Sequence, residues 1–252
     1  MAVLIFLCQR CIQLLALPIF VLSFLGLWDP MCKKVFPYVM NKLARSYNVK
    51  LHKEKQQLFS NLKDFAGSSG QLSLLEIGSG TGANFQFYPS GCRVTCTDPN
   101  PNFKDFLAKS MAENQHLQFE NFVVAPAEDL RLVSDGSVDV VVCTLVLCSV
   151  SNVTTVLKEV LRILKPIMFF PLLQGGAFFF MEHVASPRSS WKYFWQQVFD
   201  PTWKYLADGC SLTRETWKDL DKANFSEVKL QHINAPLNWT LVRPHIFGYA
   251  VK

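Results

Sequence analysis

The chain has 252 residues, of which half are hydrophobic and 18% are charged, and its formal charge is +5. This composition suits one folded domain with a modest extension and excludes an intrinsically disordered chain. The charge is unevenly spread, because residues 1–63 carry nine Lys or Arg against two acidic residues, whereas the remainder carries 16 against 18. The larger part therefore lacks the basic face of a nucleic-acid-binding domain, and we expect no nucleic-acid partner.

The N-terminal segment is almost free of charge. Arg10 is its single charged residue between Ala2 and Trp28. No pair of small residues follows the apolar run at the position that signal-peptide cleavage needs. We therefore expect residues 1–30 to be an uncleaved membrane anchor. Its marginal length and Pro18 leave open whether it spans the membrane or inserts into one leaflet.

Residues 31–70 are expected to form a basic connector between the anchor and the domain. Basic residues are more frequent after the apolar run, where Lys33, Lys34, Lys42 and Arg45 lie, than before it, where only Arg10 lies. By the positive-inside rule we therefore expect the domain in the cytosol. The eight cysteines include no CxxC pair of zinc-site spacing, so we expect reduced core thiols and no metal site. The glycosylation sequons at Asn152, Asn224 and Asn238 would be used only in a luminal domain.

From about residue 71 to the C-terminus, short apolar runs alternate with amphipathic stretches. This pattern predicts an α/β domain built from βαβ units. Strands are expected over 72–78, 93–98, 117–124, 138–145 and 177–183, with helices over 84–88, 102–114 and 152–164. Further helices are expected over 191–206 and 214–223, followed by an antiparallel pair of strands over 228–233 and 241–251.

A glycine-rich turn follows the first expected strand, in the stretch 74–82 (LLEIGSGTG). Closely spaced glycines allow the backbone to approach a ligand and leave amide groups free to bind it. The same glycines also fit a dinucleotide-binding turn, so NAD and S-adenosylmethionine both remain open. Asp98, at the end of the second strand, suits the ribose hydroxyls of either cofactor. Glu76, two residues before the first glycine, favours S-adenosylmethionine.

Several stretches together carry a family resemblance: 76–82, Asp98, 127–130 (AEDL), 137–143 (SVDVVVC) and 157–166 (LKEVLRILKP). With them the chain resembles the class I S-adenosylmethionine methyltransferases. More narrowly, the chain resembles the methyltransferase-like protein 7 group, a group of membrane-anchored alkyl thiol methyltransferases. This resemblance is carried by the N-terminal anchor with its stretch 24–28 (FLGLW), by residues 89–102 and by 181–184 (MEHV).

This resemblance implies a Rossmann-like, doubly wound sheet of seven strands with an antiparallel last pair. It also implies S-adenosyl-L-methionine as the cofactor and methyl transfer to small lipophilic thiols. The implied location is the endoplasmic reticulum membrane and the lipid droplet, with the catalytic domain facing the cytosol.

The resemblance further implies roles for single residues. Gly78, Gly80 and Gly82 match the turn under the cofactor, Glu76 the carboxylate below its methionine part, and Asp98 the ribose-binding acid.

The adenine side of the implied site departs from the family pattern. The family usually offers an acidic residue where this chain has Pro126. Recognition of the adenine edge therefore falls to the Ala127 amide or to Glu128, with Asn100 beside the ring. Leu145, after the fourth strand, is expected near the reactive methyl group.

A second departure lies before the fifth strand. The family's turn reads Lys-Pro-Gly-Gly, whereas here residues 167–174 separate Lys165-Pro166 from Gly175-Gly176. This apparent insertion lies at the sheet edge opposite the ligand and is expected to spare the site. Its apolar residues either impair folding, as in a splice-type variant, or form a tolerated loop.

A thiol acceptor reacts as its thiolate, but an alkyl thiol is mostly protonated at neutral pH. His183, at the end of the fifth strand, is the first candidate proton acceptor. Cys148, after the fourth strand, is the other catalytic candidate, because this fold places residues there near the reactive methyl group. A structural role remains open for both. The aromatic residues from Trp191 to Trp217 form either the lid of an apolar acceptor pocket or ordinary helix packing.

Three other functions stay open from the sequence. The chain either methylates another lipophilic acceptor, such as a quinone, a lipid or an arsenical, or keeps the cofactor fold as a non-catalytic lipid-droplet or reticulum protein. An NAD enzyme is the remaining alternative.

Overall fold

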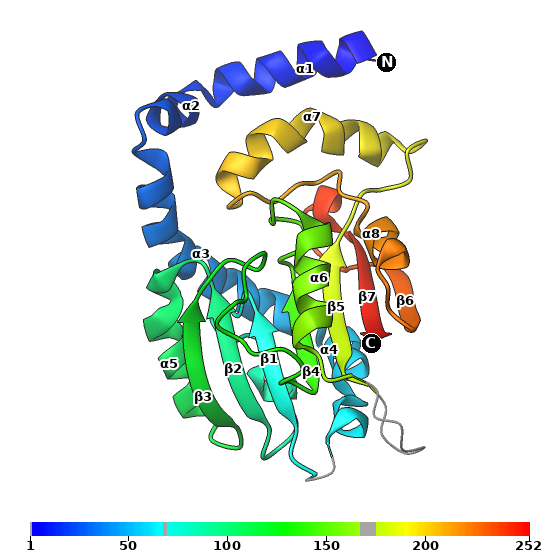
Figure 1. Cartoon of the computed structure of the whole chain (residues 1–252). Helices are drawn as coiled ribbons and strands as arrows, with labels where there is room; N and C mark the ends of the chain where they lie inside the picture. The colour runs from blue at the N-terminus through cyan, green and yellow to red at the C-terminus, as the bar shows by residue number, and fades with distance from the viewer. Residues whose placement is uncertain (1, 68–69, 167–174) are drawn as a thin grey trace.

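The computed structural model describes residues 2–67, 70–166 and 175–252 of the chain. The predicted insertion at 167–174 lies outside the described residues. A seven-stranded sheet has helices on both faces, and helices from the N-terminal segment pass over one end of it (Figure 1).

The sheet has the order β3-β2-β1-β4-β5-β7-β6. Five strands are parallel, namely β1 (Ser73–Ile77), β2 (Arg93–Asp98), β3 (Gln118–Val124), β4 (Val140–Thr144) and β5 (Ala177–His183). β7 (Pro244–Val251) is antiparallel to both of its neighbours, β5 and β6 (Glu227–Asn234). The predicted doubly wound α/β fold with an antiparallel last pair is confirmed. The strand order reverses between β1 and β4, where sheets of this kind bind ligands outside the carboxyl ends of the strands.

The core has two layers because the central strands bury both of their faces. One layer packs under α4 (His52–Phe59), the 3-10 turn η1 (Leu62–Phe65) and α5 (Lys104–Glu113). The other packs under α6 (Val153–Ile163) and α8 (Thr216–Lys222). β5 shows the pattern most clearly, since all seven of its residues are buried. This run includes one acidic residue, Glu182, with no exposed surface.

Some elements differ from their predicted bounds. The helix predicted over 84–88 is a single 3-10 turn, η2 (Phe85–Phe87), because so short a segment before Pro89 cannot propagate an α-helix. The helix predicted over 102–114 begins as a 3-10 turn, η3 (Pro101–Phe103), and continues as α5. A last 3-10 turn, η4 (Thr240–Val242), precedes β7.

The segment predicted as a connector is largely helical. It contains most of α3 (Trp28–Lys50) and all of α4. Leu51, Leu58 and Phe59 are buried in the same core layer as β1 and β2. This part of the predicted connector therefore belongs to the folded domain.

The N-terminal segment forms α1 (Ala2–Leu15) and α2 (Leu17–Phe24), which meet at a bend of 71°. Among the described residues, no helix alone has the length and apolarity to cross a membrane, but this bent pair meets both criteria jointly. α1 lies along α7 (Trp191–Leu206) (Figure 1), and Gln9 Nε2 donates to the carbonyl of Gln197 at 2.9 Å. The Phe20 and Tyr205 rings meet edge to face.

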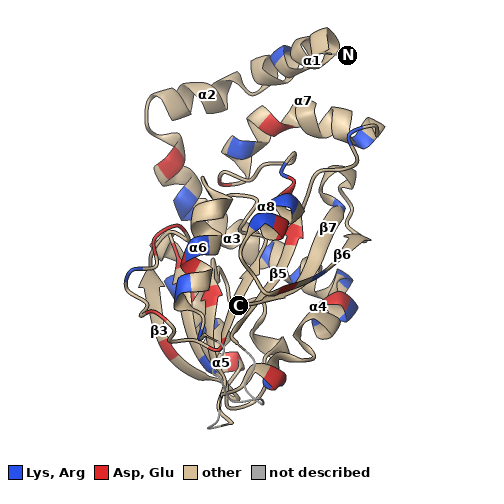
Figure 2. Cartoon of the chain, turned by 45° about the vertical axis from the view of Figure 1, so that its right-hand side comes forward, with Lys and Arg blue, Asp and Glu red and all other residues tan. Residues whose placement is uncertain are grey.

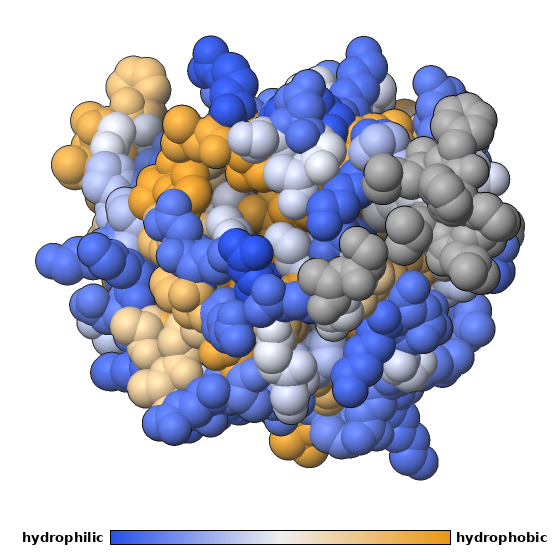
Figure 3. Space-filling model, turned by 60° about the horizontal axis from the view of Figure 1, so that its bottom comes forward, coloured by the Kyte–Doolittle hydropathy of each residue, from blue (hydrophilic) through white to orange (hydrophobic). Residues whose placement is uncertain are grey.

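The surface of α1 and α2 is strongly apolar, and Figure 2 shows almost no charged residue on either helix. By contrast, hydrophilic residues cover most of the opposite end of the molecule, with smaller apolar patches between them (Figure 3). The large exposed apolar side chains of α1 and α2 are Val3, Leu4, Phe6, Leu7, Leu14, Leu15, Leu17, Val21 and Phe24.

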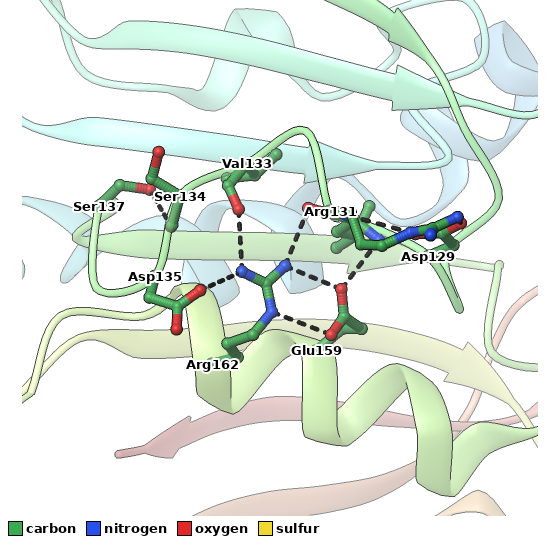
Figure 4. Close-up of polar contacts among 9 residues, drawn as sticks. Asp129, Arg131, Val133, Ser134, Asp135, Ser137, Glu159 and Arg162 are labelled. Atoms are coloured by element: carbon green, nitrogen blue, oxygen red, sulfur yellow. Dashed lines mark hydrogen bonds and ion pairs between the residues drawn. The ribbon is translucent and has the colours of Figure 1, made fainter.

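Arg162 at the end of α6 ties this helix to the loop before β4 (Figure 4). Its guanidinium donates to the carboxylates of Glu159 and Asp135 and to the carbonyls of Leu130 and Val133, at 2.5–2.9 Å. Charge-assisted hydrogen bonds of this kind are stronger than neutral ones. The loop is thereby fixed to the helix that covers β4.

We expect Arg162→Ala to lower the free energy of unfolding by about 2 kcal/mol, because it leaves several partly buried acceptors without a charged donor. Chemical denaturation measures this change. Arg131→Ala is the matched control, since Arg131 pairs with Asp129 at the exposed surface and its loss should leave stability unchanged. Equal destabilisation by the two substitutions would contradict this assignment.

Candidate active site

The glycine turn after β1 is too closely packed to accept side chains. Gly78, Gly80 and Gly82 have φ angles of +60°, +52° and +72°. A Cβ atom on Gly78 would lie 2.4 Å from Cγ2 of Val146, and one on Gly82 would lie 2.6 Å from the Phe85 ring. The turn therefore presents bare backbone beside the end of β1, where a ligand can approach it closely.

Glu76, on β1 just before this turn, is buried in a polar network. Its Oε1 accepts a hydrogen bond from Asn84 Nδ2 at 2.7 Å, and Asn84 Oδ1 accepts one from the buried Lys55 at 2.7 Å. The buried Tyr88 hydroxyl also lies near this carboxylate and acts on it as a hydrogen-bond donor. Burial raises the pKa of Glu76 to about 7, against the lowering effects of Tyr88, Asn84 and Lys55. A buried carboxylate beside the glycine turn suits a cationic group of a ligand.

Asp98 ends β2 and faces the same turn. Its Oδ2 accepts from the Gly80 amide at 3.1 Å and its Oδ1 from the Asn100 amide at 2.9 Å. Burial raises the pKa of Asp98 to about 6, although these two amides lower it. The Asn100 side chain is directed toward α3, because its Nδ2 donates to the carbonyl of Lys33 at 2.8 Å. The structure therefore brings together the predicted residues 76–82, Asp98 and Asn100.

Ala127 and Glu128 lie in the loop after β3, and Ala127 is buried. Glu128 Oε1 accepts from the amides of Ser151 and Asn152, at 2.6 and 3.4 Å, just before α6. Its carboxylate thus holds the start of that helix. Contact of these two residues with an adenine ring stays a prediction.

The loop after β4 is fixed by a residue that the sequence analysis missed. Glu182 of β5 accepts from the amides of Val146 and Leu147, both at 3.0 Å, and from that of Cys148 at 3.3 Å. Leu145, just before these amides, has a left-handed backbone with φ of 59°. The sequence does contain a signal for this role, because Glu182 is an acidic residue inside an otherwise apolar strand. A buried carboxylate is stable only when hydrogen-bond donors surround it.

Cys148 and His183, the two predicted catalytic candidates, lie together beyond the ends of β4 and β5. A third residue, Cys210, joins them, and their ligand atoms all lie within 4.8 Å of one another. His183 Nε2 lies 2.7 Å from Cys210 Sγ, and Trp203 Nε1 donates to the same sulfur at 3.4 Å. We name these three residues the Cys-His-Cys cluster. Cys210 follows α7, and no sequence spacing connects it with the other two.

The contacts of the cluster perturb its protonation. The hydrogen bond from Cys148 lowers the pKa of the Cys210 thiol well below its ordinary value, with His183 and Trp203 acting in the same direction against burial. Burial alone would lower the pKa of His183, but the neighbouring Cys210 raises it. His183 Nε2 is thus engaged with Cys210, and its Nδ1 is buried without a partner in the described structure.

A cavity of about 650 Å³ lies at the same edge of the sheet, between the ends of β5, β6 and β7 and the start of α7. His245, whose ring is 6.3 Å from that of His183, connects this cavity to the cluster. Its lining is mainly apolar and includes Val184, Ala185, Pro187, Trp191 and Ile233. The volume lies in the range of small-molecule sites.

Comparison with known proteins decides the family. A family model described as a methyltransferase domain matches residues 75–170. The human thiol S-methyltransferase TMT1A is 64% identical over 231 residues, which cover 92% of this chain and 91% of that protein. The human thiol S-methyltransferase TMT1B is 57% identical over 252 residues and is covered completely by this chain. The chain belongs to the thiol S-methyltransferase family.

Solved structures agree on the fold of this methyltransferase. An S-adenosylmethionine-dependent methyltransferase from Aquifex aeolicus superposes with a TM-score of 0.54 at 13% identity, covering 85% of this chain and 97% of that one. The [4+2]-cyclase SpnF superposes with a TM-score of 0.55 at 16% identity, covering 78% and 79%. Similar folds thus carry different names, so the family assignment depends on sequence identity.

S-adenosylmethionine is the cofactor of this methyltransferase, and the residues at the site fit it. The buried Glu76 carboxylate suits the ammonium of its methionine part. The glycines from Gly78 to Gly82 present backbone without side chains to the ligand. Asp98 suits the ribose hydroxyls. The predicted enzyme class and cofactor are confirmed, and the NAD alternative is set aside.

Cofactor binding to this methyltransferase is expected to weaken in acid. The pKa of Glu76 is about 7 and that of Asp98 about 6, so both carboxylates protonate as the pH falls from 8 to 5. A neutral Glu76 loses its attraction for the ammonium, and a protonated Asp98 loses acceptor capacity. Calorimetric titration across this pH range should show a dissociation constant that rises steadily toward acid. A constant that is flat from pH 8 to 5 would contradict the assigned roles.

Proposed function

We propose that this methyltransferase works at a membrane surface and methylates small lipophilic thiols that reach it from the bilayer. The single observation that carries this proposal is the position of the exposed apolar surface of α1 and α2. These helices lie at the end of the molecule toward which the parallel strands point their carboxyl ends (Figure 1). The cofactor turn and the Cys-His-Cys cluster lie at these strand ends, so the acceptor site opens on the side that would meet the lipid.

The N-terminal helices have the composition of an interfacial anchor. Apart from Arg10, α1 and α2 contain no Lys, Arg, Asp or Glu. The basic residues Lys33 and Lys34 follow in α3, where they would meet anionic headgroups. A bent helix pair lying in one leaflet keeps its apolar side chains in lipid without spanning the membrane. The proposed location is the cytosolic surface of the endoplasmic reticulum and of lipid droplets.

The acceptor is proposed to place its hydrocarbon part in the cavity lined by Val184, Trp191 and Ile233. Its sulfur would then lie beside Cys148 and His183. The apolar part of the lining favours a lipophilic molecule.

The cofactor supplies a methyl group on a positively charged sulfur, which is already activated for transfer. The protein's own residues supply position and a dry environment. In the proposed arrangement, Glu76, Gly78, Gly80, Gly82, Asp98 and Asn100 hold the cofactor. Leu145 borders the methyl side, and Ala127 and Glu128 border the adenine side. Glu182 keeps the loop 146–148 in place.

A paired substitution in α1 and α2 tests the membrane part of the proposal. Leu14 and Phe24 are 69% and 91% exposed, so Leu14→Asp with Phe24→Asp should not disturb the fold. We expect the double variant to lose flotation with phosphatidylcholine vesicles while it keeps S-adenosylmethionine binding. Leu132→Asp is the control, because Leu132 is 78% exposed but lies in the loop before β4. Full flotation of the double variant would contradict membrane docking through these helices.

The sidedness of the protein needs a separate measurement. Asn152, Asn224 and Asn238 are glycosylation sequons, and a cytosolic domain leaves them unmodified. We expect no mobility shift on glycosidase treatment of the protein expressed in mammalian cells. A shift that disappears in the Asn238→Gln variant would place the domain in the lumen.

A further inference from the structure

The Cys-His-Cys cluster is a convergence of metal-binding side chains from three separate parts of the chain. Cys148 comes from the loop after β4, His183 from the end of β5, and Cys210 from the segment after α7. All three are buried, and their ligand atoms lie within 4.8 Å of one another. No metal site is expected from the sequence, because its cysteines lack the close spacing of a zinc motif.

We propose that Cys148, His183 and Cys210 bind a Zn²⁺ ion whose fourth coordination position takes the sulfur of the acceptor thiol. This inference rests on the proposed function, because it places the acceptor's sulfur at the cluster. Two thiolates and one imidazole, with a free fourth position, form a donor set that catalytic zinc uses in proteins. The two thiolates also neutralise the charge of the ion, which a buried site requires.

The contacts around the cluster orient its two cysteines, whereas Nδ1 of His183 has no partner among the described residues. Trp203 donates its indole N–H to Cys210 Sγ at 3.4 Å, a contact that stabilises a thiolate. The backbone of Cys148 is fixed by Glu182, because the Cys148 amide donates to Oε2 of Glu182 at 3.3 Å. His183 is held by the pairing of β5 with β7, opposite His245. Outer contacts of this type set the geometry and affinity of metal ligands.

Only small movements separate the cluster from tetrahedral geometry. Ligand atoms around tetrahedral zinc lie roughly 3.5 Å apart, given the usual metal-to-ligand distances. His183 Nε2 and Cys210 Sγ, now 2.7 Å apart, would open by about 1 Å. Rotation of the cysteine side chains provides this movement without a change of the strands.

Zinc at this position would solve the protonation problem of a thiol acceptor. On binding the ion, the acceptor R–SH replaces a bound water as R–S⁻, and its proton leaves to solvent water. The thiolate sulfur then forms a bond to the methyl carbon as the carbon–sulfonium bond breaks, giving a thioether and S-adenosylhomocysteine. The neutral thioether is a weak ligand, so water replaces it. Soft sulfur is preferred over oxygen acceptors at such a site.

Metal content and cobalt spectroscopy test the site directly. The full-length protein, purified in detergent without chelator, should contain close to one zinc per chain by mass spectrometry. After exchange with Co²⁺, thiolate ligands should give visible d–d bands and a sulfur-to-metal charge-transfer band. Addition of octanethiol should change these bands, because a third sulfur enters the coordination shell.

Matched cysteine variants separate the cluster from the other buried thiols. Cys210→Ser and Cys148→Ser should each weaken Zn²⁺ binding by at least 10-fold, whereas Cys92→Ala, a buried core cysteine outside the cluster, should leave it unchanged. Calorimetric binding of S-adenosylmethionine reports in each variant whether the domain is folded. If a cysteine variant no longer binds S-adenosylmethionine, His183→Gln takes its place in the comparison of Zn²⁺ affinities with Cys92→Ala.

Two results would overturn the zinc proposal. One is the absence of bound zinc and of cobalt bands in protein that binds S-adenosylmethionine. The other is full methylation of octanethiol by protein stripped of metal, a result that leaves the proposed function intact. A third result separates the two proposals. If octanethiol changes the cobalt bands but the protein transfers methyl only to a quinone or a lipid, the metal site is supported and the thiol function is overturned.

Discussion

Replacement of Gly78 with alanine is expected to lower the free energy of unfolding by about 3 kcal/mol and to abolish measurable cofactor binding. The added Cβ would lie 2.4 Å from Val146 Cγ2, and the φ angle of +60° is strained for any L-amino acid with a side chain. Either the turn or the loop after β4 must move, and both border the proposed cofactor site. Chemical denaturation and calorimetric titration measure the two effects.

Gly91→Ala is the matched control for Gly78→Ala. Gly91 also has a positive φ, +78°, but a Cβ there would meet no atom within 4 Å. This control therefore carries the conformational strain alone, of about 1 kcal/mol, and should keep full cofactor affinity. Equal losses in the two variants would show that the close contact with Val146 is unimportant.

Glu182→Gln is expected to reduce kcat by roughly 10- to 100-fold, the equivalent of losing charge-assisted hydrogen bonds to backbone amides. A glutamine directs its NH₂ group toward one of the three amides that the carboxylate now holds, so the loop 146–148 loses its fixed position. The acceptor site next to Cys148 should suffer more than the cofactor site. Steady-state kinetics with a saturating thiol and a separate cofactor titration distinguish the two.

The control for Glu182→Gln is Glu227→Gln on the edge strand β6. Glu227 makes a surface ion pair with Lys229 and should tolerate the change. If Glu182→Gln keeps its kcat, the carboxylate does not position the loop. If cofactor affinity falls as far as kcat, the substitution has damaged the whole strand.

The sequence predicted the fold well because local patterns determined it. The buried parallel strands are short apolar runs, and two of them, Arg93–Asp98 and Ala177–His183, have the predicted bounds. The grouping of Glu76 with the glycines was also predictable, since they lie within one strand and one turn, and their contact with the cofactor stays a prediction. Asp98 could be placed because the end of a neighbouring parallel strand meets the same edge.

The acceptor side depends on contacts between distant segments, which a single sequence does not show. Cys210 meets His183 only because the segment after α7 folds back over the end of β5. The role of Glu182 likewise follows from three backbone amides that belong to another strand's loop. The bend between α1 and α2 lies at Pro18, which cannot continue the hydrogen bonds of α1, but the packing of α1 along α7 is a tertiary contact.

The most direct test of the account is methyl transfer to a series of alkyl thiols. The full-length protein in phospholipid vesicles is incubated with S-adenosylmethionine labelled in its methyl group and with thiols, quinones and long-chain alcohols of matched chain length. We expect labelled thioethers, formed at rates that rise with chain length, and no labelled product from the other acceptors. Label transferred to a quinone or an alcohol but not to any thiol, by protein that binds the cofactor, would contradict it.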